Sequence, residues 1–121
     1  MITIKRAYDP PSPSDGTRVL VDGLWPRGIS KEKLKLDMWL KDIAPSAALR
    51  KWFSHDPERW AEFQRRYIDE LKQNAQAWGP IAEAAHNHHV TLVFGSKDVE
   101  HNNAVVLQNF LSTHGNTHSR S

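Results

Sequence analysis

The sequence predicts a small α/β domain in three layers, a mostly parallel sheet of three or four short strands with helices on both faces. Three short segments, at 3–8, 17–22 and 90–94, have the length and boundaries of strands. The second and third are continuous apolar runs, and several helical patterns lie between them. Apolar strands joined through helices are typical of a parallel sheet covered on both faces. We expect a right-handed crossover between these two strands.

The size and composition are those of one globular domain. The chain has 121 residues, of which 39% are hydrophobic and 25% charged, and we expect one domain with a flexible tail over 112–121. The absence of cysteine excludes disulfides, zinc–thiolate sites and thiol catalysis, and fits a reducing compartment. Apolar runs reach only three or four residues, whereas a membrane span needs about 20. With no signal-peptide pattern at the N-terminus, these features predict a cytoplasmic protein without membrane contact.

Proline and serine mark the boundaries of the first helices. Three prolines within four residues predict a surface loop over 9–16. Ser30 is the expected N-cap of a short helix that includes Leu34, Met38 and Trp39 and stops before Pro45. Ser46 is expected to cap a second short helix.

The strongest helical pattern follows Asp56. An N-cap carboxylate followed directly by Pro57 is a clear start signal, and His55 is interpreted as a neighbour of this cap. Aromatic and aliphatic residues recur at helical spacing from Trp60 to Leu71. We expect this helix to end at Gly79-Pro80, with one further helix over 81–86 and a last amphipathic helix over 102–111.

A candidate ligand site lies where the strands end. In open parallel sheets, ligands bind beyond the carboxyl ends of the strands. The segments 22–30 and 95–103 leave two predicted strands at that edge and face each other if the strands are neighbours. The expected crevice contains Asp22, Trp25, Arg27, Lys97, Asp98, Glu100, His101 and Asn102.

Arg27 is the leading candidate for holding an anion. It lies between a proline and a glycine, just before a helix start whose free N–H groups favour negative charge. The alternative is that Arg27 pairs with Asp22 or Asp98 and holds the loop. Trp25 is the candidate for stacking on a ligand ring. Asp22 is a candidate general base, metal ligand or partner of Arg27, or a turn carboxylate that accepts backbone N–H bonds.

The run from Lys97 to Asn102 is the densest polar segment of the chain. His101 beside carboxylates is suited to acid–base chemistry, so Asp22 and His101 are the catalytic candidates. The same residues also make good helix caps, which is the structural alternative. We expect no metal site, since no second ligand lies three or four residues after His101.

The sequence also resembles a known bacterial family of unknown function. The matching segments are 18–28, 44–46 and 49–56, the positions Trp60, Phe63, Tyr67, Glu70 and Leu71, and 92–111 with its Asp98, Glu100, His101, Asn102 and Ala104. They identify the chain, over 2–111, as similar to the YeaO-like branch of domain-of-unknown-function family 488. This resemblance implies a small α/β fold in a bacterial cytoplasm, with no established activity.

One position departs from the wider family. That family often carries a Cys-His-Arg triplet after its last strand, where this chain has Glu100-His101-Asn102. Only the histidine is kept, so a thiol-based role is not expected here. The sequence also lacks a recognisable helix-turn-helix and a glycine-rich cofactor loop, and we expect no cofactor.

These observations predict a binder of, or an enzyme on, a small anionic ligand of nucleotide or phosphate type, with Arg27 and Lys97 holding the charge. Two alternatives stay open. One is a non-enzymatic protein-interaction domain. The other is a weak nucleic-acid-binding module, although the net charge of +2 is small and its basic residues are spread along the chain. The sequence does not define the oligomeric state.

Overall fold

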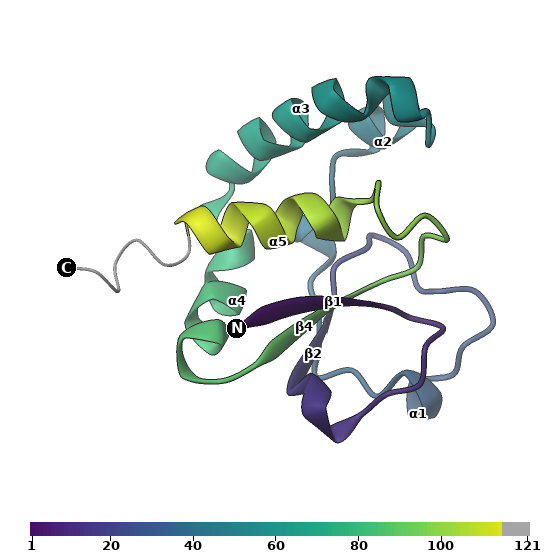
Figure 1. The fold of residues 1–121 in the computed structure, drawn as a ribbon, viewed down its shortest axis with the longest axis vertical. Coiled ribbons are helices and arrows are strands. Elements are labelled where there is room, and N and C mark those ends of the chain that lie inside the picture. The colour runs from purple at the N-terminus through teal and green to yellow at the C-terminus, as the bar shows by residue number, and fades with distance from the viewer. Residues whose placement is uncertain (115–121) are drawn as a thin grey trace.

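A computed structural model of the protein describes residues 1–114 (Figure 1). Within this range, four strands form one sheet: β1 (Ile2–Arg6), β2 (Thr17–Leu20), β3 (Met38–Trp39) and β4 (Val90–Phe94). The strand order is β1-β4-β2-β3, and each neighbouring pair is parallel. The predicted α/β class with a parallel sheet is therefore confirmed.

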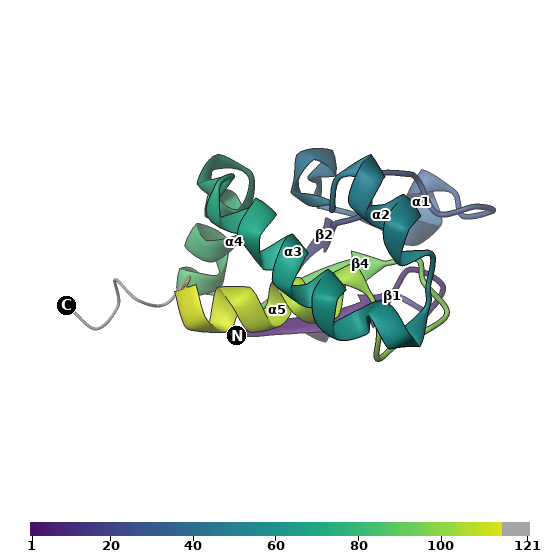
Figure 2. The same ribbon diagram turned by 90° about the horizontal axis from the view of Figure 1, so that it is seen from above.

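The helices connect the strands. The α-helices are α1 (Lys31–Leu34), α2 (Ala47–Phe53), α3 (Trp60–Lys72), α4 (Ala75–Asn87) and α5 (Asn103–His114), and the short 3-10 helices are η1 (Pro13–Asp15), η2 (Lys41–Ile43) and η3 (Pro57–Arg59). Figure 2 shows α3 and α5 stacked over the sheet, with α5 next to β1 and β4. The long helices α3 and α5 therefore cover one face of the sheet, whereas the other face carries neither of them.

Alternation along β4 builds a separate core on each face. Leu92 and Phe94 join the main core with residues of the long helices, whereas Val93 points into a smaller core with Leu20 and Leu34. All five residues of β4 are buried, as expected for a central strand of a parallel sheet. The smaller core is closed by α1 and by the chain that follows β2, which brings that chain against the sheet.

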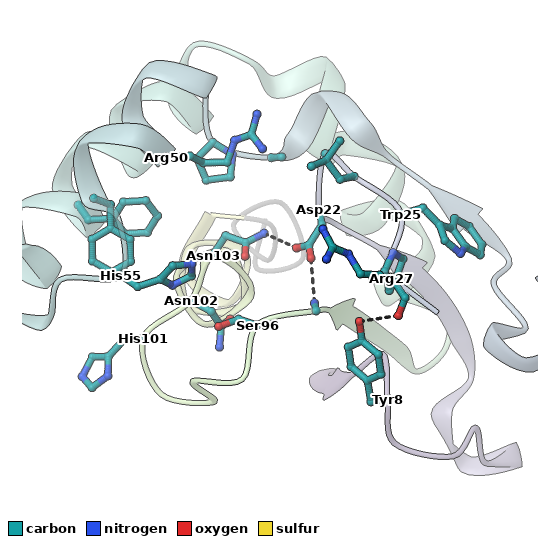
Figure 3. Close-up of a pocket in the computed structure, with 18 residues that line it drawn as sticks. Tyr8, Asp22, Trp25, Arg27, Arg50, His55, Ser96, His101, Asn102 and Asn103 are labelled. Carbon is teal, nitrogen blue, oxygen red and sulfur yellow. Dashed lines mark hydrogen bonds between the residues drawn. The ribbon is translucent and has the colours of Figure 1, made fainter. Parts of the chain in front are cut away.

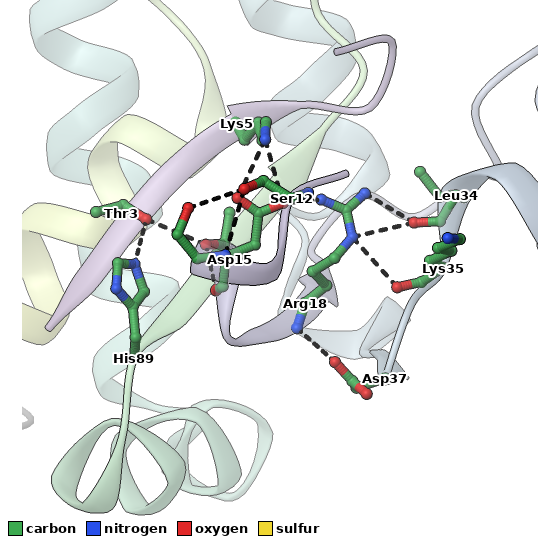
Figure 4. A network of polar contacts seen from close by, with 11 residues as sticks. Thr3, Lys5, Ser12, Asp15, Arg18, Leu34, Lys35, Asp37 and His89 are labelled. Atoms are coloured by element: carbon green, nitrogen blue, oxygen red, sulfur yellow. Dashed lines mark hydrogen bonds and ion pairs between the residues drawn. The ribbon is translucent and has the colours of Figure 1, made fainter. Parts of the chain in front are cut away.

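A buried polar network joins the loop before β2 to α1 (Figure 4). Arg18, which is 4% exposed, donates to Asp15 at 2.7 Å and to the backbone oxygen of Leu34 at 2.7 Å. Lys5 lies 3.1 Å from the same carboxylate, and the Ser12 backbone donates to it at 3.0 Å. Asp15 therefore neutralises two cations, one from β1 and one from β2.

The predicted helix over 30–39 is wrong beyond Leu34. Ser30 caps α1 as expected, but Lys35 adopts a left-handed conformation with φ of 50° and ends the helix after one turn. The chain then forms β3, which pairs with β2 through Val19 and Leu20. Tertiary pairing with an exposed edge of the sheet outweighs the helical spacing of the apolar residues.

The predicted helix end at Gly79-Pro80 is also wrong. α3 ends at Lys72, and α4 passes through Gly79 and Pro80. Packing explains this continuity, because Ile81 is fully buried and the Trp78 indole donates to the Leu71 backbone oxygen at 2.8 Å. These contacts outweigh the low helix propensity of the pair.

Two features concern the chain end and the membrane. α5 begins at Asn103 and continues to His114, so the first residues of the expected tail are helical, and residues 115–121 of that tail lie outside the described range. Among residues 1–114, no helix has both the length and the apolar character needed to cross a membrane.

Candidate functional site

A cavity of about 340 Å³ lies beyond the carboxyl ends of β2 and β4 (Figure 3). Because these strands are neighbours, the segments that follow them meet at one edge, as the sequence predicts. The opposite wall comes from the chain before α2, from α2 itself and from α3. The lining residues are Tyr8, Asp22 to Arg27, Ala44, Pro45, Arg50, Phe53, His55, Phe63, Gly95, Ser96 and His101 to Asn103.

Asp22 ties three elements together at the edge of this cavity. One carboxylate oxygen accepts the Gly95 N–H at 2.8 Å, and the other accepts the Asn103 amide at 3.1 Å. Burial raises the pKa of Asp22, although these two donors and the positive charge of Arg50 oppose the rise. The expected bonds to N–H groups just downstream are replaced by bonds to residues far along the chain.

Arg27 and Arg50 bring two guanidinium groups to the cavity. Figure 3 shows the Arg27 side chain extending from its loop toward the side where Asp22 lies. The Arg50 guanidinium lies about 3.6 Å from the position a β-carbon would take on Gly23. Among residues 1–114, neither side chain makes a hydrogen bond or ion pair, so the alternative pairing of Arg27 with Asp22 or Asp98 is not observed.

Trp25 and Tyr8 both support the loop that carries Arg27. The Trp25 indole donates to the Ile29 backbone oxygen at 2.7 Å, and its ring packs edge-on against Trp39 at 5.4 Å. The ring points away from the cavity in Figure 3. The Tyr8 hydroxyl donates to the Arg27 backbone oxygen at 2.9 Å. These contacts fix the backbone on both sides of Arg27.

The loop after β4 is organised by Asp98. Its carboxylate accepts the backbone N–H groups of Glu100 and His101 at 3.0 Å and lies 3.0 Å from the His101 ring. The Glu100 N–H, with the contacts from His101, holds the pKa of Asp98 below its ordinary value. The His101 ring also packs edge-on against Trp60 at 5.1 Å. Asp98 therefore closes a turn that precedes α5, which begins only at Asn103.

The eight candidates from the sequence therefore divide into two groups. Asp22, Trp25, Arg27, His101 and Asn102 line the cavity, whereas Lys97, Asp98 and Glu100 are exposed residues outside its lining. Asn102 is buried and caps α5 by accepting the Val105 N–H at 3.1 Å. Asp22 and His101 both line the cavity, but in Figure 3 the His101 ring points away from Asp22, and the two residues hold different partners.

Sequence reasoning missed Arg50 and His55 as cavity residues. Ser54 and His55 both have left-handed φ angles, of 45° and 57°, and this turn after α2 directs the imidazole toward the cavity (Figure 3). Non-glycine residues rarely adopt such angles. Nothing in the sequence indicates that α2 faces the ends of β2 and β4. The adjacent Asp56 caps η3, as expected, by accepting the Glu58 N–H at 3.0 Å.

Other candidate chemistry is absent or neutralised in the described part of the chain. Among residues 1–114, no group of three or more histidine, aspartate or glutamate side chains is placed to hold a metal ion. Arg65 and Arg66, two basic residues of α3 that a nucleic acid could contact, both pair with Glu62, at 2.6 Å and 2.7 Å. Their charge is therefore partly neutralised by their own helix.

The fold and the cavity define a small α/β protein with a candidate binding site at the carboxyl edge of a parallel sheet. A family model described as the inactive DUF488-N3 subclade matches residues 1–120, and the chain belongs to this family. The resemblance to the YeaO-like branch of family 488 is therefore confirmed.

Sequence similarity to several bacterial proteins extends over nearly the whole chain. YeaO of Escherichia coli K12 is 44% identical over 110 residues, which cover 91% of this chain and 96% of that protein. Rv3073c of Mycobacterium tuberculosis H37Rv and Mb3100c of Mycobacterium bovis are each 40% identical over 111 residues, covering 92% of this chain and 93% of each relative. All three are described as uncharacterised proteins. No solved structure matches the chain.

Proposed function

We propose that this protein binds a small anionic molecule in the cavity beyond β2 and β4 and does not transform it. One observation carries the proposal. The guanidinium groups of Arg27 and Arg50 line the same cavity, and within residues 1–114 neither is paired with an acidic side chain. A carboxylate or phosphate would supply the missing acceptor.

The chemistry of the cavity suits such a ligand. A guanidinium group offers donors in a planar fork that matches the oxygens of a carboxylate or phosphate. Pro45, Phe53 and Phe63 supply an apolar wall, which lowers the local polarity and strengthens charge-assisted hydrogen bonds. Ser96 and Asn103 add polar groups that can orient a ligand.

Two features favour binding without catalysis. Each carboxylate oxygen of Asp22 already accepts a hydrogen bond, and the His101 ring is held between Asp98 and Trp60. The catalytic roles expected of Asp22 and His101 stay predictions, and in our proposal both residues position their neighbours. The description of the matching family as inactive supports the same reading.

Calorimetric titration of the full chain with inorganic phosphate, benzoate and a nucleoside monophosphate tests the proposal. We expect saturable binding of at least one of these anions, and Arg27→Ala or Arg50→Ala should weaken it at least about tenfold. Arg65→Ala removes the same charge from the exposed face of α3 and should change little. Equal loss in all three variants would show a general charge effect and would contradict the site.

Asp22→Asn provides a further arm of the same titration. Removing the half-buried negative charge of Asp22 from the cavity should tighten anion binding, by about fivefold at separations of a few ångströms. The asparagine can still accept the Gly95 N–H, so the loop contact is kept.

Long incubation of the wild-type protein with the titrated anion tests the non-catalytic role. We expect to recover the anion unchanged, and conversion of the anion would contradict this role.

A further inference from the structure

The segments that leave the sheet at the edge with the cavity carry exposed apolar side chains. Apart from Met1, the exposed large apolar residues among residues 1–114 are Leu24, Val99 and Tyr8, which are 72%, 53% and 46% exposed. They follow three different strands, β2, β4 and β1. Tyr8 and Leu24 line the cavity, and Val99 belongs to the loop that supplies Ser96 and His101 to the lining.

Hydrogen bonds join the segments that follow β1, β2 and β4. The Tyr8 hydroxyl donates to the Arg27 backbone oxygen, and the Arg6 guanidinium lies 5.1 Å from the centre of the Tyr8 ring. Arg6 also donates to the Ser96 backbone oxygen at 3.0 Å, which ties the end of β1 to the loop after β4. A binding surface whose segments are held together loses less conformational entropy when a partner binds than a mobile surface does.

The arrangement combines two exposed cations in the cavity lining, Arg27 and Arg50, with exposed apolar side chains on the segments that follow the strands. A complementary partner carries a negative charge at its tip and apolar groups directly behind it. The end of a polypeptide chain that finishes in apolar residues has this order, because its α-carboxylate projects beyond the last side chain. Capture of a terminal carboxylate is a known mode of peptide recognition.

We propose that the cavity binds the C-terminal end of a partner protein, with the α-carboxylate at Arg27 and Arg50 and the last apolar side chains against Tyr8, Leu24 and Val99. This proposal rests on the anion-binding function proposed above and names the source of the anion. The partner is therefore a protein with an accessible C-terminus of apolar residues.

Fluorescence polarisation with the full chain tests this proposal. The probes are labelled hexapeptides whose last three residues are combinations of Leu, Val and Phe, each made with a free and with an amidated C-terminus. A third set places a glutamate inside an amidated peptide of the same apolar composition. We expect saturable binding of free-acid peptides and at least about tenfold weaker binding after amidation. An internal glutamate should not restore the binding that amidation removes.

Two variants separate the contribution of the exposed apolar side chains to binding from the contribution of the anion site. Val99→Ser lies outside the cavity lining and should weaken peptide binding about threefold to tenfold while leaving benzoate binding unchanged. Arg50→Ala should weaken both peptide and benzoate. Thermal melting of each variant checks that the fold is kept, and both positions are exposed.

Each outcome bears on one proposal or on both. Binding of benzoate or phosphate without binding of any free-acid peptide overturns the C-terminal partner and leaves the anion site. Equal binding of free and amidated peptides, or of the internal-glutamate peptides, also overturns it. Absence of binding by every small anion and every peptide overturns both proposals.

Discussion

Two aspartates, the buried Asp15 before β2 and the half-buried Asp22 after it, differ in the direction of their pKa shift. Burial alone raises the pKa of Asp15, but hydrogen bonds from the Ser12 backbone, Lys5 and Arg18 outweigh it and hold the pKa below its ordinary value. Burial dominates at Asp22 and raises its pKa. The compensated charge at Asp15 stabilises the fold, whereas the poorly compensated charge lies at the candidate site, where such groups often mark function.

The difference predicts how acid affects stability. Because the native pKa of Asp15 is lowered, its contribution is complete above the unfolded value of about 3.9 and is lost as the pH falls through the native value. Asp15→Asn leaves Arg18 buried without its anion and should lower the free energy of unfolding at pH 7 by about 3 kcal/mol. Urea unfolding measured between pH 7 and pH 2.5 checks this.

The advantage of the wild type over Asp15→Asn should shrink steadily below about pH 4. Asp9→Asn is the matched control, since Asp9 is exposed in the same loop and should show little effect at any pH. A difference between wild type and Asp15→Asn that stays constant down to the lowest pH would contradict the role given to this carboxylate.

At the scale of elements, short-range signals predict the capped helix starts well, whereas the helix ends and the start of α4 at Ala75 are predicted poorly. Ser30, Ser46 and Asp56 cap their helices as expected, because a cap acts on N–H groups two or three residues away. The end of α3 and the path of α4 through Gly79-Pro80 depend on packing of Trp78 and Ile81 against distant residues, which the sequence does not display.

Gly79→Ala tests the continuity of α4. A β-carbon on Gly79 meets no atom beyond its chain neighbours within 4 Å, and its φ is not positive. Pro80 offsets part of the gain in helix propensity, because its ring disfavours the helical conformation of a preceding residue with a β-carbon, so alanine should raise the free energy of unfolding by less than about 1 kcal/mol. Chemical denaturation measures the change. If the chain instead turned at Gly79, as the sequence predicts, alanine would be destabilising.

Gly16→Ala is the contrasting variant for this experiment. Gly16 has φ of 67°, and a β-carbon there would lie 2.2 Å from the His89 backbone oxygen. Its free energy of unfolding should therefore fall. An equal response of the two glycines would contradict their assigned conformations.

At the scale of the whole molecule, the sequence predicts one wall of the cavity and not the other. The loops after β2 and β4 are expected to meet because both follow buried parallel strands, and the strand order β1-β4-β2-β3 places them side by side. The opposite wall, with Arg50 and His55, depends on how α2 and α3 pack over the sheet. No local pattern encodes this packing, so these two residues could not be predicted.

NMR titration of the full chain with benzoate or phosphate tests the anion site most directly, by following the Nε–Hε signals of the arginine side chains. We predict saturable shifts, with one common affinity, for Arg27 and Arg50 and for the backbone amides of Gly95 and Ser96. The Arg65 signal should stay in place. Shifts that grow linearly without saturation, or that appear at Arg65 and not at Arg27 and Arg50, would contradict an anion site in this cavity.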